Sequence, residues 1–354
     1  MQTHRFDFAS DNTAGICPEA WRALDEANHA TDRSYGGDRW TRRLTELVRE
    51  MFETDCEPFM VFNGTAANSL ALAQICRPFH AIVCHERAHI QTDECGGPEF
   101  MSGGAKLLTV GGANGKLDLA AVEELLGRYL DVHSSKPRVI SVTESTESGT
   151  VYTRDELAEI ADFARARGLL LHMDGARFAN AIASLGCKPK EITWQLGIDV
   201  LCLGGTKNGT GGGEVVVFFN KALAEDFDYR IKQSAQLASK MRFTSAPWCG
   251  LLADGVWLRN AQHSNAMADL LATKLRDAIS VEPEFPRQAN AIFVRLPREI
   301  PDELHARGWQ FAEFFQPGLY RLMCSWATTE ERIDEFIADV KDSHARLRSF
   351  APTR

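Results

Sequence analysis

The stretch Leu169–Arg177 reads LLLHMDGAR and places an acid, Asp174, directly after an apolar run. The run Leu169–Met173 predicts a buried strand, because short apolar runs bounded by turn residues are typical of strands. An acid at the exit of such a strand is expected to be either paired in the interior or functional. Asp174 is therefore the first candidate functional residue.

A second predicted strand, Val200–Leu203, is followed by a lysine. Residues 202–209 read CLGGTKNG, so Lys207 lies among glycines at the exit of that strand. Taken singly, Asp174 fits a helix-capping aspartate and Lys207 fits a loop lysine. As a pair, they suggest a lysine that forms a Schiff base with an aldehyde cofactor and an acid that protonates the cofactor's ring nitrogen.

An earlier strand exit offers a phosphate site. Residues 63–68, NGTAAN, follow the predicted strand Pro58–Phe62 and open a predicted helix. Gly64 lets the backbone approach an anion, the Thr65 hydroxyl can donate, and a helix N-terminus attracts negative charge. These residues alone also fit an ordinary helix cap. With Lys207 and Asp174 they supply the three anchors of pyridoxal 5′-phosphate (PLP), which we predict as the cofactor.

The wider pattern is an alternation of short apolar runs and amphipathic stretches. Further strands are expected at residues 81–84, 106–109, 138–143 and 214–219. Helices with apolar spacing near 3.6 are expected at residues 118–129 and 154–167. Strands that are apolar throughout and separated by helices predict an α/β fold with a mostly parallel central sheet between helices.

The rhythm changes near residue 245. One long helical stretch is expected from Pro247 towards Ala278, followed by strands at residues 291–296 and 319–324 and a helix at residues 330–347. We therefore predict a large PLP-binding domain with an N-terminal arm, residues 1–245, and a small C-terminal α/β domain, residues 246–354. A length of 354 residues agrees with about two domains.

Composition excludes several classes of protein. A net charge of −9 argues against a nucleic-acid binder, and no apolar window is long enough to span a membrane. The N-terminus lacks the basic and apolar regions of a secretory signal. Nine cysteines without any C-x-x-C pair predict buried, reduced thiols and a cytoplasmic location.

The segment His85–His89, HERAH, matches a zinc-hydrolase motif. That motif requires a helix interior, whereas this segment follows the predicted strand at residues 81–84. A zinc hydrolase that uses His85 and His89 therefore stays a distant alternative. No P-loop or dinucleotide-binding glycine pattern is present at the first strand exit.

The whole set of motifs resembles the fold-type-I PLP enzymes, and within them the low-specificity L-threonine aldolases and the related phenylserine aldolases. The resemblance runs from about Phe8 to the C-terminal helix. The matching segments are residues 10–12 (SDN), 35–38 (YGGD), 62–68, 88–89, 133, 172–180, 205–209, 240–242 and 321–326.

The resemblance implies a role for each cofactor-binding residue. Lys207 would form the Schiff base and Asp174 would pair with the pyridine nitrogen. Gly64 and Thr65 would hold the phosphate, and His89 would stack on the cofactor ring.

It also implies the substrate contacts for a small-molecule β-hydroxy-α-amino acid. Arg177 and Arg321 would orient the ring oxygen and the substrate carboxylate, with help from Ser10. His89 and His133 would approach the β-hydroxyl group, and which of them is the base stays open.

Tyr35 and Arg242 would reach the substrate and cofactor of a neighbouring subunit. The family relationship implies a homo-oligomer with sites at a dimer interface, and we expect a tetramer, although the sequence itself does not choose between dimer and tetramer. The glycines at residues 211–213 suggest a mobile loop after Lys207, and His85 is expected to be a surface or supporting histidine.

The implied reaction is the retro-aldol cleavage of L-threonine or L-allo-threonine to glycine and acetaldehyde, with L-phenylserine as a further substrate. Another PLP reaction remains as an alternative: phenylserine aldolase proper, β-eliminating lyase, aminotransferase or racemase. A PLP-binding protein without catalytic activity is a third possibility.

Overall fold

The computed structural model describes residues 4–29 and 31–350. Its main feature is a seven-stranded sheet with the order β1-β7-β6-β5-β4-β2-β3. The strands are β1 (Glu57–Val61), β2 (His80–His85), β3 (Lys106–Val110), β4 (Lys136–Thr143), β5 (Leu170–Gly175), β6 (Val200–Leu203) and β7 (Glu214–Phe218). All seven overlap strands expected from the sequence.

Strand direction brings the candidate residues to one edge. Strands β3, β2, β4, β5 and β6 are parallel neighbours, and β7 runs antiparallel to both β6 and β1. Strand β1 therefore points the same way as β6. The mostly parallel sheet is confirmed, with β7 reversed, and the exits of β1, β2, β5 and β6 lie at the same carboxyl edge.

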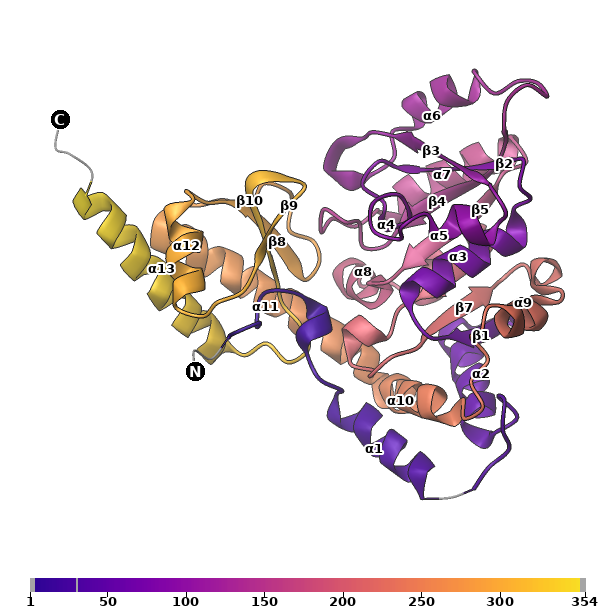
Figure 1. The fold of residues 1–354 in the computed structure, drawn as a ribbon, viewed down its shortest axis with the longest axis horizontal. Helices are drawn as coiled ribbons and strands as arrows, with labels where there is room; N and C mark the ends of the chain where they lie inside the picture. Colours follow the sequence, from indigo (N-terminus) through magenta and orange to yellow (C-terminus); the bar gives the residue numbers. More distant parts are fainter. Residues whose placement is uncertain (1–3, 30, 351–354) are drawn as a thin grey trace.

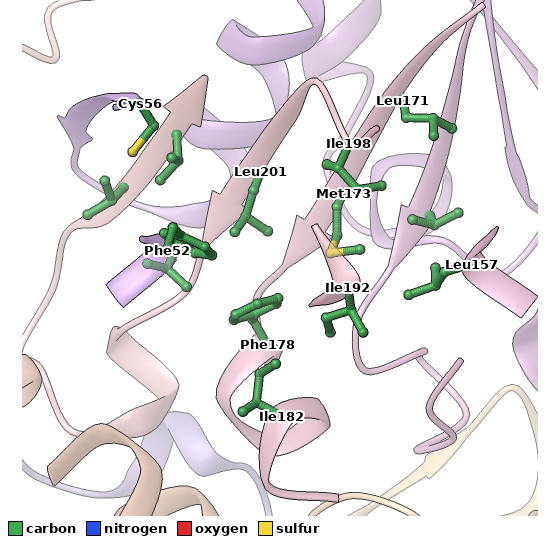
Figure 2. Close-up of a cluster of buried hydrophobic side chains, with 14 of the residues drawn as sticks. Phe52, Cys56, Leu157, Leu171, Met173, Phe178, Ile182, Ile192, Ile198 and Leu201 are labelled. Atoms are coloured by element: carbon green, nitrogen blue, oxygen red, sulfur yellow. The ribbon is translucent and has the colours of Figure 1, made fainter. Parts of the chain in front are cut away.

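Helices cover both faces of this sheet (Figure 1). The helices of this part of the chain are α1 (Pro18–Asn28), α2 (Arg39–Phe52), α3 (Gly64–Ile75), α4 (His89–Thr92), α5 (Gly97–Met101), α6 (Leu119–Leu126), α7 (Arg154–Ala166), α8 (Phe178–Leu185), α9 (Phe227–Gln233) and α10 (Arg242–Leu252). Successive residues of β6 belong to different hydrophobic clusters, one on each face of the sheet. Leu201 lies in the cluster with residues of α2, α7 and α8, whereas Cys202 lies in the cluster with residues of α3 and α9. Figure 2 shows the first cluster, in which Phe52, Phe178 and Met173 meet Leu201.

A smaller sheet stands apart from the first (Figure 1). It has the order β8-β10-β9, all antiparallel. Its elements are α11 (Val256–Ile279), β8 (Ala291–Arg295), α12 (Glu299–Ala306), β9 (Ala312–Phe314), β10 (Gln316–Met323) and α13 (Glu330–Phe350). They surround a separate hydrophobic cluster built on residues such as Leu271, Trp309 and Phe336.

The expected single helix over residues 247–278 is two helices. Helix α10 ends at Leu252 and α11 begins at Val256. Between them Asp254 and Gly255 have φ values of 50° and 70°. A left-handed pair ends a right-handed helix, and glycine adopts that conformation without a steric penalty, so the chain turns there.

The N-terminal arm packs against the small sheet. Phe8 is buried in its cluster, and the Met323 amide donates to the Phe8 carbonyl at 3.0 Å. Helix α1 then packs on α10. The division into residues 1–245 and 246–354 stays a prediction, and the arm crosses from one cluster to the other.

All nine cysteines are free thiols. Seven are buried, as predicted, whereas Cys187 is half-buried and Cys95 is exposed, so the prediction is wrong for Cys95. In the part of the chain that the structure describes, no helix is long and apolar enough to cross a membrane.

Candidate active site

A cavity of about 350 Å³ opens at the carboxyl edge of the large sheet. It is lined by residues from four strand exits and the N-terminal arm, among them Asn12, Thr65, His89, Asp174, Lys207 and Glu214. A larger hollow of about 790 Å³ lies at the other end of the sheet and is lined by none of the predicted site residues. The smaller cavity is therefore the candidate site, because a lysine, an acid and a helix N-terminus converge there.

The N-terminus of α3 faces this cavity. Asn63 is its N-cap, and its side-chain oxygen accepts the Ala66 amide at 2.9 Å. A Cβ atom placed on Gly64 would find no heavy atom within 4 Å, so the backbone there is open to a ligand. Thr65 also lines the cavity. The free amides of the first turn favour an anion such as a phosphate.

Asp174 lies in β5 and is buried at the cavity wall. Its Oδ1 accepts the Ala176 amide at 3.0 Å, and its Oδ2 accepts the Asn68 side-chain amide at 3.0 Å. Two donors orient the carboxylate while leaving lone pairs on both oxygens. Asp174 is thus equipped to accept a third hydrogen bond from a protonated ring nitrogen.

Lys207 lies in a short 3-10 turn, Thr206–Asn208, whose surroundings are closely packed. A Cβ atom on Gly205 would come within 2.4 Å of the Trp248 ring, and one on Gly211 within 2.5 Å of Ile16. The Glu214 carboxylate accepts the Gly205 amide at 2.6 Å. Gly205 and Gly211 thus allow close contacts beside the lysine turn, whereas a Cβ atom on Gly212 would meet no heavy atom within 4 Å. The mobile loop at residues 211–213 stays a prediction.

His89 opens α4 and lines the cavity. Its Nδ1 lies 2.8 Å from Oε1 of Glu94, whose side chain is fully buried. The hydrogen bond with Glu94 raises the pKa of His89, and burial raises the pKa of Glu94. The hydrogen bond with Glu94 therefore favours a proton on the His89 ring.

Arg177 is held by a buried acid. Its Nε and Nη2 donate to the two oxygens of Asp11 at 2.7 and 3.0 Å, and Asn290 donates to the same carboxylate at 3.1 Å. Burial alone would raise the pKa of Asp11, but the charges of Arg177 and Lys207 lower it. Asp11 therefore stays ionised, and it lies close enough to feel the charge of Lys207.

Arg321 lies on β10 near Arg177 and lacks an acidic partner. Its guanidinium is 4.3 Å from the centre of the Phe314 ring, and it forms no ion pair with the residues that the structure describes. Burial, followed by the charge of Arg177, lowers the pKa of Arg321. A half-buried cation without a carboxylate is suited to bind the carboxylate of a ligand.

Six predicted site residues do not line this cavity: Ser10, Tyr35, His133, Arg177, Arg242 and Arg321. His133 is exposed in the turn that precedes β4, at the amino end of the strand and so at the opposite edge of the sheet. Tyr35 is exposed beneath the Lys232 ammonium, and Arg242 donates to the carbonyl of Ala27 at 3.2 Å. Within one chain the structure therefore does not bring His133, Tyr35 or Arg242 to Lys207.

Ser10 lies beside the site rather than in its wall. Its Oγ accepts the Asn12 amide at 3.2 Å and lies 3.5 Å from Oδ1 of Asp11. Asn12 itself lines the cavity.

The HERAH segment is a strand exit, as expected. Strand β2 ends at His85 and α4 begins at His89. The His85 ring lies 3.2 Å from the Gly112 carbonyl through Nε2 and accepts the Arg87 amide through Nδ1. Among the described residues no group of three or more His, Cys, Asp or Glu side chains is arranged to hold a metal ion. His85 has a structural role, because both of its nitrogens are engaged by the backbone.

Sequence reasoning missed five buried polar residues around the site. They are Asp11, Asn68, Glu94, Glu214 and Asn290. Asp11, Asn68 and Asn290 find partners in distant parts of the chain, whereas Glu94 and Glu214 also bond residues five and nine positions away. One signal in the sequence could have indicated such residues: a polar residue within an otherwise apolar segment, such as Asn68 in an Ala- and Leu-rich helix.

The described residues fit PLP. The open backbone at Gly64, the doubly supported carboxylate of Asp174 and the closely packed turn of Lys207 line one cavity. They supply an anion site, an acceptor for a ring N–H group and a primary amine, which are the groups that this cofactor requires.

Comparisons with known proteins agree with this chemistry. The model of the β-eliminating lyase family matches residues 7–297. The chain is 54% identical over 334 residues to the low-specificity L-threonine aldolase of Pseudomonas sp. (strain NCIMB 10558), covering 94% of this chain and 96% of that one. It is 53% identical over 341 residues to the enzyme of the same name from Pseudomonas aeruginosa, covering 96% and 99%.

A solved structure of a threonine aldolase from Leishmania major matches with a TM-score of 0.90 and 28% identity, covering 96% of this chain and 99% of that one. The match confirms the predicted fold class. The chain thus belongs to the β-eliminating lyase family of fold-type-I PLP-dependent enzymes and, within it, to the low-specificity L-threonine aldolases.

Proposed function

We propose that this protein cleaves the Cα–Cβ bond of β-hydroxy-α-amino acids, converting L-threonine or L-allo-threonine to glycine and acetaldehyde and accepting L-phenylserine-type substrates. The observation that carries the proposal is the meeting of Lys207 and Asp174 at one cavity, with the unpaired cation Arg321 nearby. Identity of 53–54% to low-specificity L-threonine aldolases supports the same reaction.

The cofactor is PLP. Lys207 would hold it as a Schiff base, Asp174 would accept a hydrogen bond from its ring nitrogen, and the first turn of α3 at Gly64 and Thr65 would hold its phosphate. When bound, PLP supplies an electron sink for the charge that develops at Cα.

The substrate carboxylate is assigned to Arg321, whose planar guanidinium can bind it through two parallel hydrogen bonds. Arg177 is already paired with Asp11 through Nε and Nη2, so it can donate to a ligand only through its remaining hydrogens. Ser10 adjoins this pair and can add a hydroxyl contact. A fixed carboxylate orients the substrate and so selects which bond at Cα is broken.

The base for the β-hydroxyl group is assigned to His89, which lines the cavity. A histidine with a pKa near the working pH is well suited to accept this proton. His133 lies at the other edge of the sheet, so a catalytic role for it would require the site of another copy of the chain.

We further propose a homo-oligomer, with a tetramer as the expected form, in which Tyr35 and Arg242 contribute to a neighbouring site. Neither residue lines the cavity of its own chain, which supports this arrangement. The nine free thiols support a location in the reducing cytoplasm.

The test is to incubate the purified PLP-loaded enzyme separately with L-threonine, L-allo-threonine and L-phenylserine and to measure both aldehyde and glycine. We expect the two products in equal amounts, and loss of activity in Lys207→Ala. Formation of a keto acid, ammonia or a D-amino acid in place of glycine would overturn the proposal in favour of another PLP reaction.

A further inference from the structure

Glu94 is a buried carboxylate with no role in the site as assigned above. It lies between α4 and α5, and its side chain is fully buried. Its Oε1 lies 2.8 Å from Nδ1 of His89 and accepts the side-chain amide of Asn68, also at 2.8 Å. Burying a carboxylate is costly, so a location directly behind a candidate base calls for a functional explanation.

Asn68 joins this carboxylate to a second one. Its single Nδ2 atom donates to Glu94 Oε1 at 2.8 Å and to Asp174 Oδ2 at 3.0 Å. Chemistry settles the orientation of the amide, since the opposite orientation would point its oxygen at two acceptors. The Asn68 amide therefore connects Glu94, the partner of His89, to Asp174, the residue assigned to the cofactor nitrogen.

We propose that Glu94 is a positioning residue for His89 and that Asn68 ties it to Asp174, so that His89 carries its proton on Nδ1 and presents Nε2 to the β-hydroxyl group. This inference rests on the proposed function, because it gives His89 the task of accepting the substrate's proton.

The geometry leaves Nε2 available. With Nδ1–H donating to Glu94, the lone pair of the neutral imidazole is on Nε2. Nε2 forms no hydrogen bond to any residue that the structure describes, and the side chain is 31% exposed at the cavity wall.

The proton of the β-hydroxyl passes to Nε2, the O–H electron pair becomes the second bond of the aldehyde carbonyl, and the Cα–Cβ pair stays on Cα.

The surrounding charges favour this proton transfer. Glu94 faces His89 from the segment after α4, Asp174 from β5, and Glu147 from the loop after β4. All three are acidic, and the hydrogen bond with Glu94 contributes most to the raised pKa of His89. An imidazolium formed at His89 is thus stabilised by the groups that orient it.

The first test uses the enzyme without PLP. Residue-resolved labelling with diethyl pyrocarbonate, followed by peptide mass spectrometry across a pH series, measures the apparent pKa of His89. We expect Glu94→Gln, which keeps the side-chain shape, to lower that pKa by about one unit, since it removes the opposite charge. Glu86→Gln is the matched control, because Glu86 is exposed and belongs to the same HERAH segment. An unchanged pKa in Glu94→Gln would overturn the proposal.

The second test separates positioning of the base from general damage to the site. Exchange of the α-protons of glycine in D₂O requires the loaded site but has no β-hydroxyl group to deprotonate. We expect Glu94→Gln to slow cleavage of L-threonine by about 10- to 100-fold, a share of what a general base contributes, and to leave glycine exchange within about two-fold. A parallel loss of both reactions would show a merely structural role.

A double-mutant cycle guards against loss of folding. In a His89→Asn background, Glu94→Gln should cause no further loss of cleavage, because it acts through the missing imidazole. Additive losses would contradict the proposal. A wild-type enzyme that exchanges glycine protons but does not cleave L-threonine would contradict the proposed function, while the labelling experiment would still test the tie between Glu94 and His89.

Discussion

Two neighbouring arginines differ in what the protein supplies to them. Arg177 donates two hydrogen bonds to the Asp11 carboxylate, whereas Arg321 has no carboxylate partner among the described residues. The first arrangement stabilises the fold, because Asp11 would otherwise be an uncompensated buried charge. The second leaves a cation ready for substrate. Both residues are arginines, so their different roles follow from their different hydrogen-bond partners and not from the residue type.

We therefore expect opposite outcomes for matched substitutions. Arg177→Gln should lower the free energy of unfolding by about 3–5 kcal/mol, because Asp11 is left buried without its cation. Arg321→Gln should change stability little and raise the KM for L-threonine by about 10- to 100-fold, through the loss of charged hydrogen bonds. Urea unfolding and steady-state kinetics measure the two effects. Equal losses of stability in both variants would contradict the assignment.

Glu144 is a buried acid outside the catalytic set. Its Oε1 accepts the Tyr152 amide at 2.8 Å, and Oε2 has no partner among the described residues. Burial raises the pKa of Glu144 well above its usual value. The folded state then binds a proton that the unfolded state releases, so this contribution to stability is full at low pH and is lost as pH rises towards the folded pKa.

Glu144→Gln should remove this pH dependence, since glutamine keeps the acceptor and cannot ionise. The free energy of unfolding of the variant, relative to wild type, should increase between about pH 5 and about pH 8. Urea unfolding at several pH values measures this difference, with the exposed Glu159→Gln as control. A difference that stays flat with pH would show that Glu144 does not titrate in this range.

At the scale of elements, the turn that carries Lys207 is set by close packing. Glycines allow Trp248, Ala176 and Cys17 to contact the backbone from residue 204 to residue 209. The Trp248 Nε1 donates to the Gly213 carbonyl at 2.8 Å, which joins α10 to the start of β7. This glycine-rich turn is therefore closely packed, because the space that a side chain would need is filled by neighbouring elements.

Gly205→Ala tests that packing. Its added methyl group would meet the Trp248 ring at 2.4 Å, so we expect a loss of about 1–3 kcal/mol in the free energy of unfolding, as in overpacked cores, together with a change in tryptophan fluorescence. Gly15→Ala is the matched control, because a Cβ atom there has no neighbour within 4 Å. Equal stability of the two variants would mean that the turn can move aside.

At the scale of the whole molecule, the N-terminal arm connects the two sheets across the site. Phe8 is anchored in the cluster of the small sheet. Three residues later Asp11 binds Arg177, which follows β5 of the large sheet, and Asn290, which precedes β8 of the small one. The arm therefore sets the distance between the parts that supply Lys207 and Arg321. Asp11 is the point at which the three segments meet.

Phe8→Ala should loosen this connection. Phe8 packs against Trp309 and Phe336 with ring centres 5.8 and 4.9 Å away, so its loss should cost about 3–5 kcal/mol in the free energy of unfolding. Phe6→Ala is the control two residues away, since Phe6 is 49% exposed, and it should change stability by less than about 0.5 kcal/mol. Urea unfolding of both variants decides between an anchored arm and a loosely attached one.

Local patterns predicted the strands of the large sheet, because apolar runs and their turn residues act over a few positions. They also predicted that Lys207, Asp174 and Gly64 lie together, because the exits of parallel strands meet at one edge. The family resemblance added His89, which lines the same cavity. Local patterns failed at the break between α10 and α11, where two residues with left-handed backbone interrupt an apolar pattern that continues on both sides. The periodicity of side chains does not report such a turn.

By itself, the sequence determined the α/β architecture and the positions of a lysine, an acid and a phosphate-binding helix N-terminus along the chain. Only the tertiary structure decided how these groups are supported: Glu94 behind His89, Asn68 between two carboxylates, and Asp11 on Arg177. It also separated His133 from the cavity. The physical reason is that short-range patterns encode secondary structure, whereas the partner of a buried charge is chosen by which distant segments pack around it and exclude water.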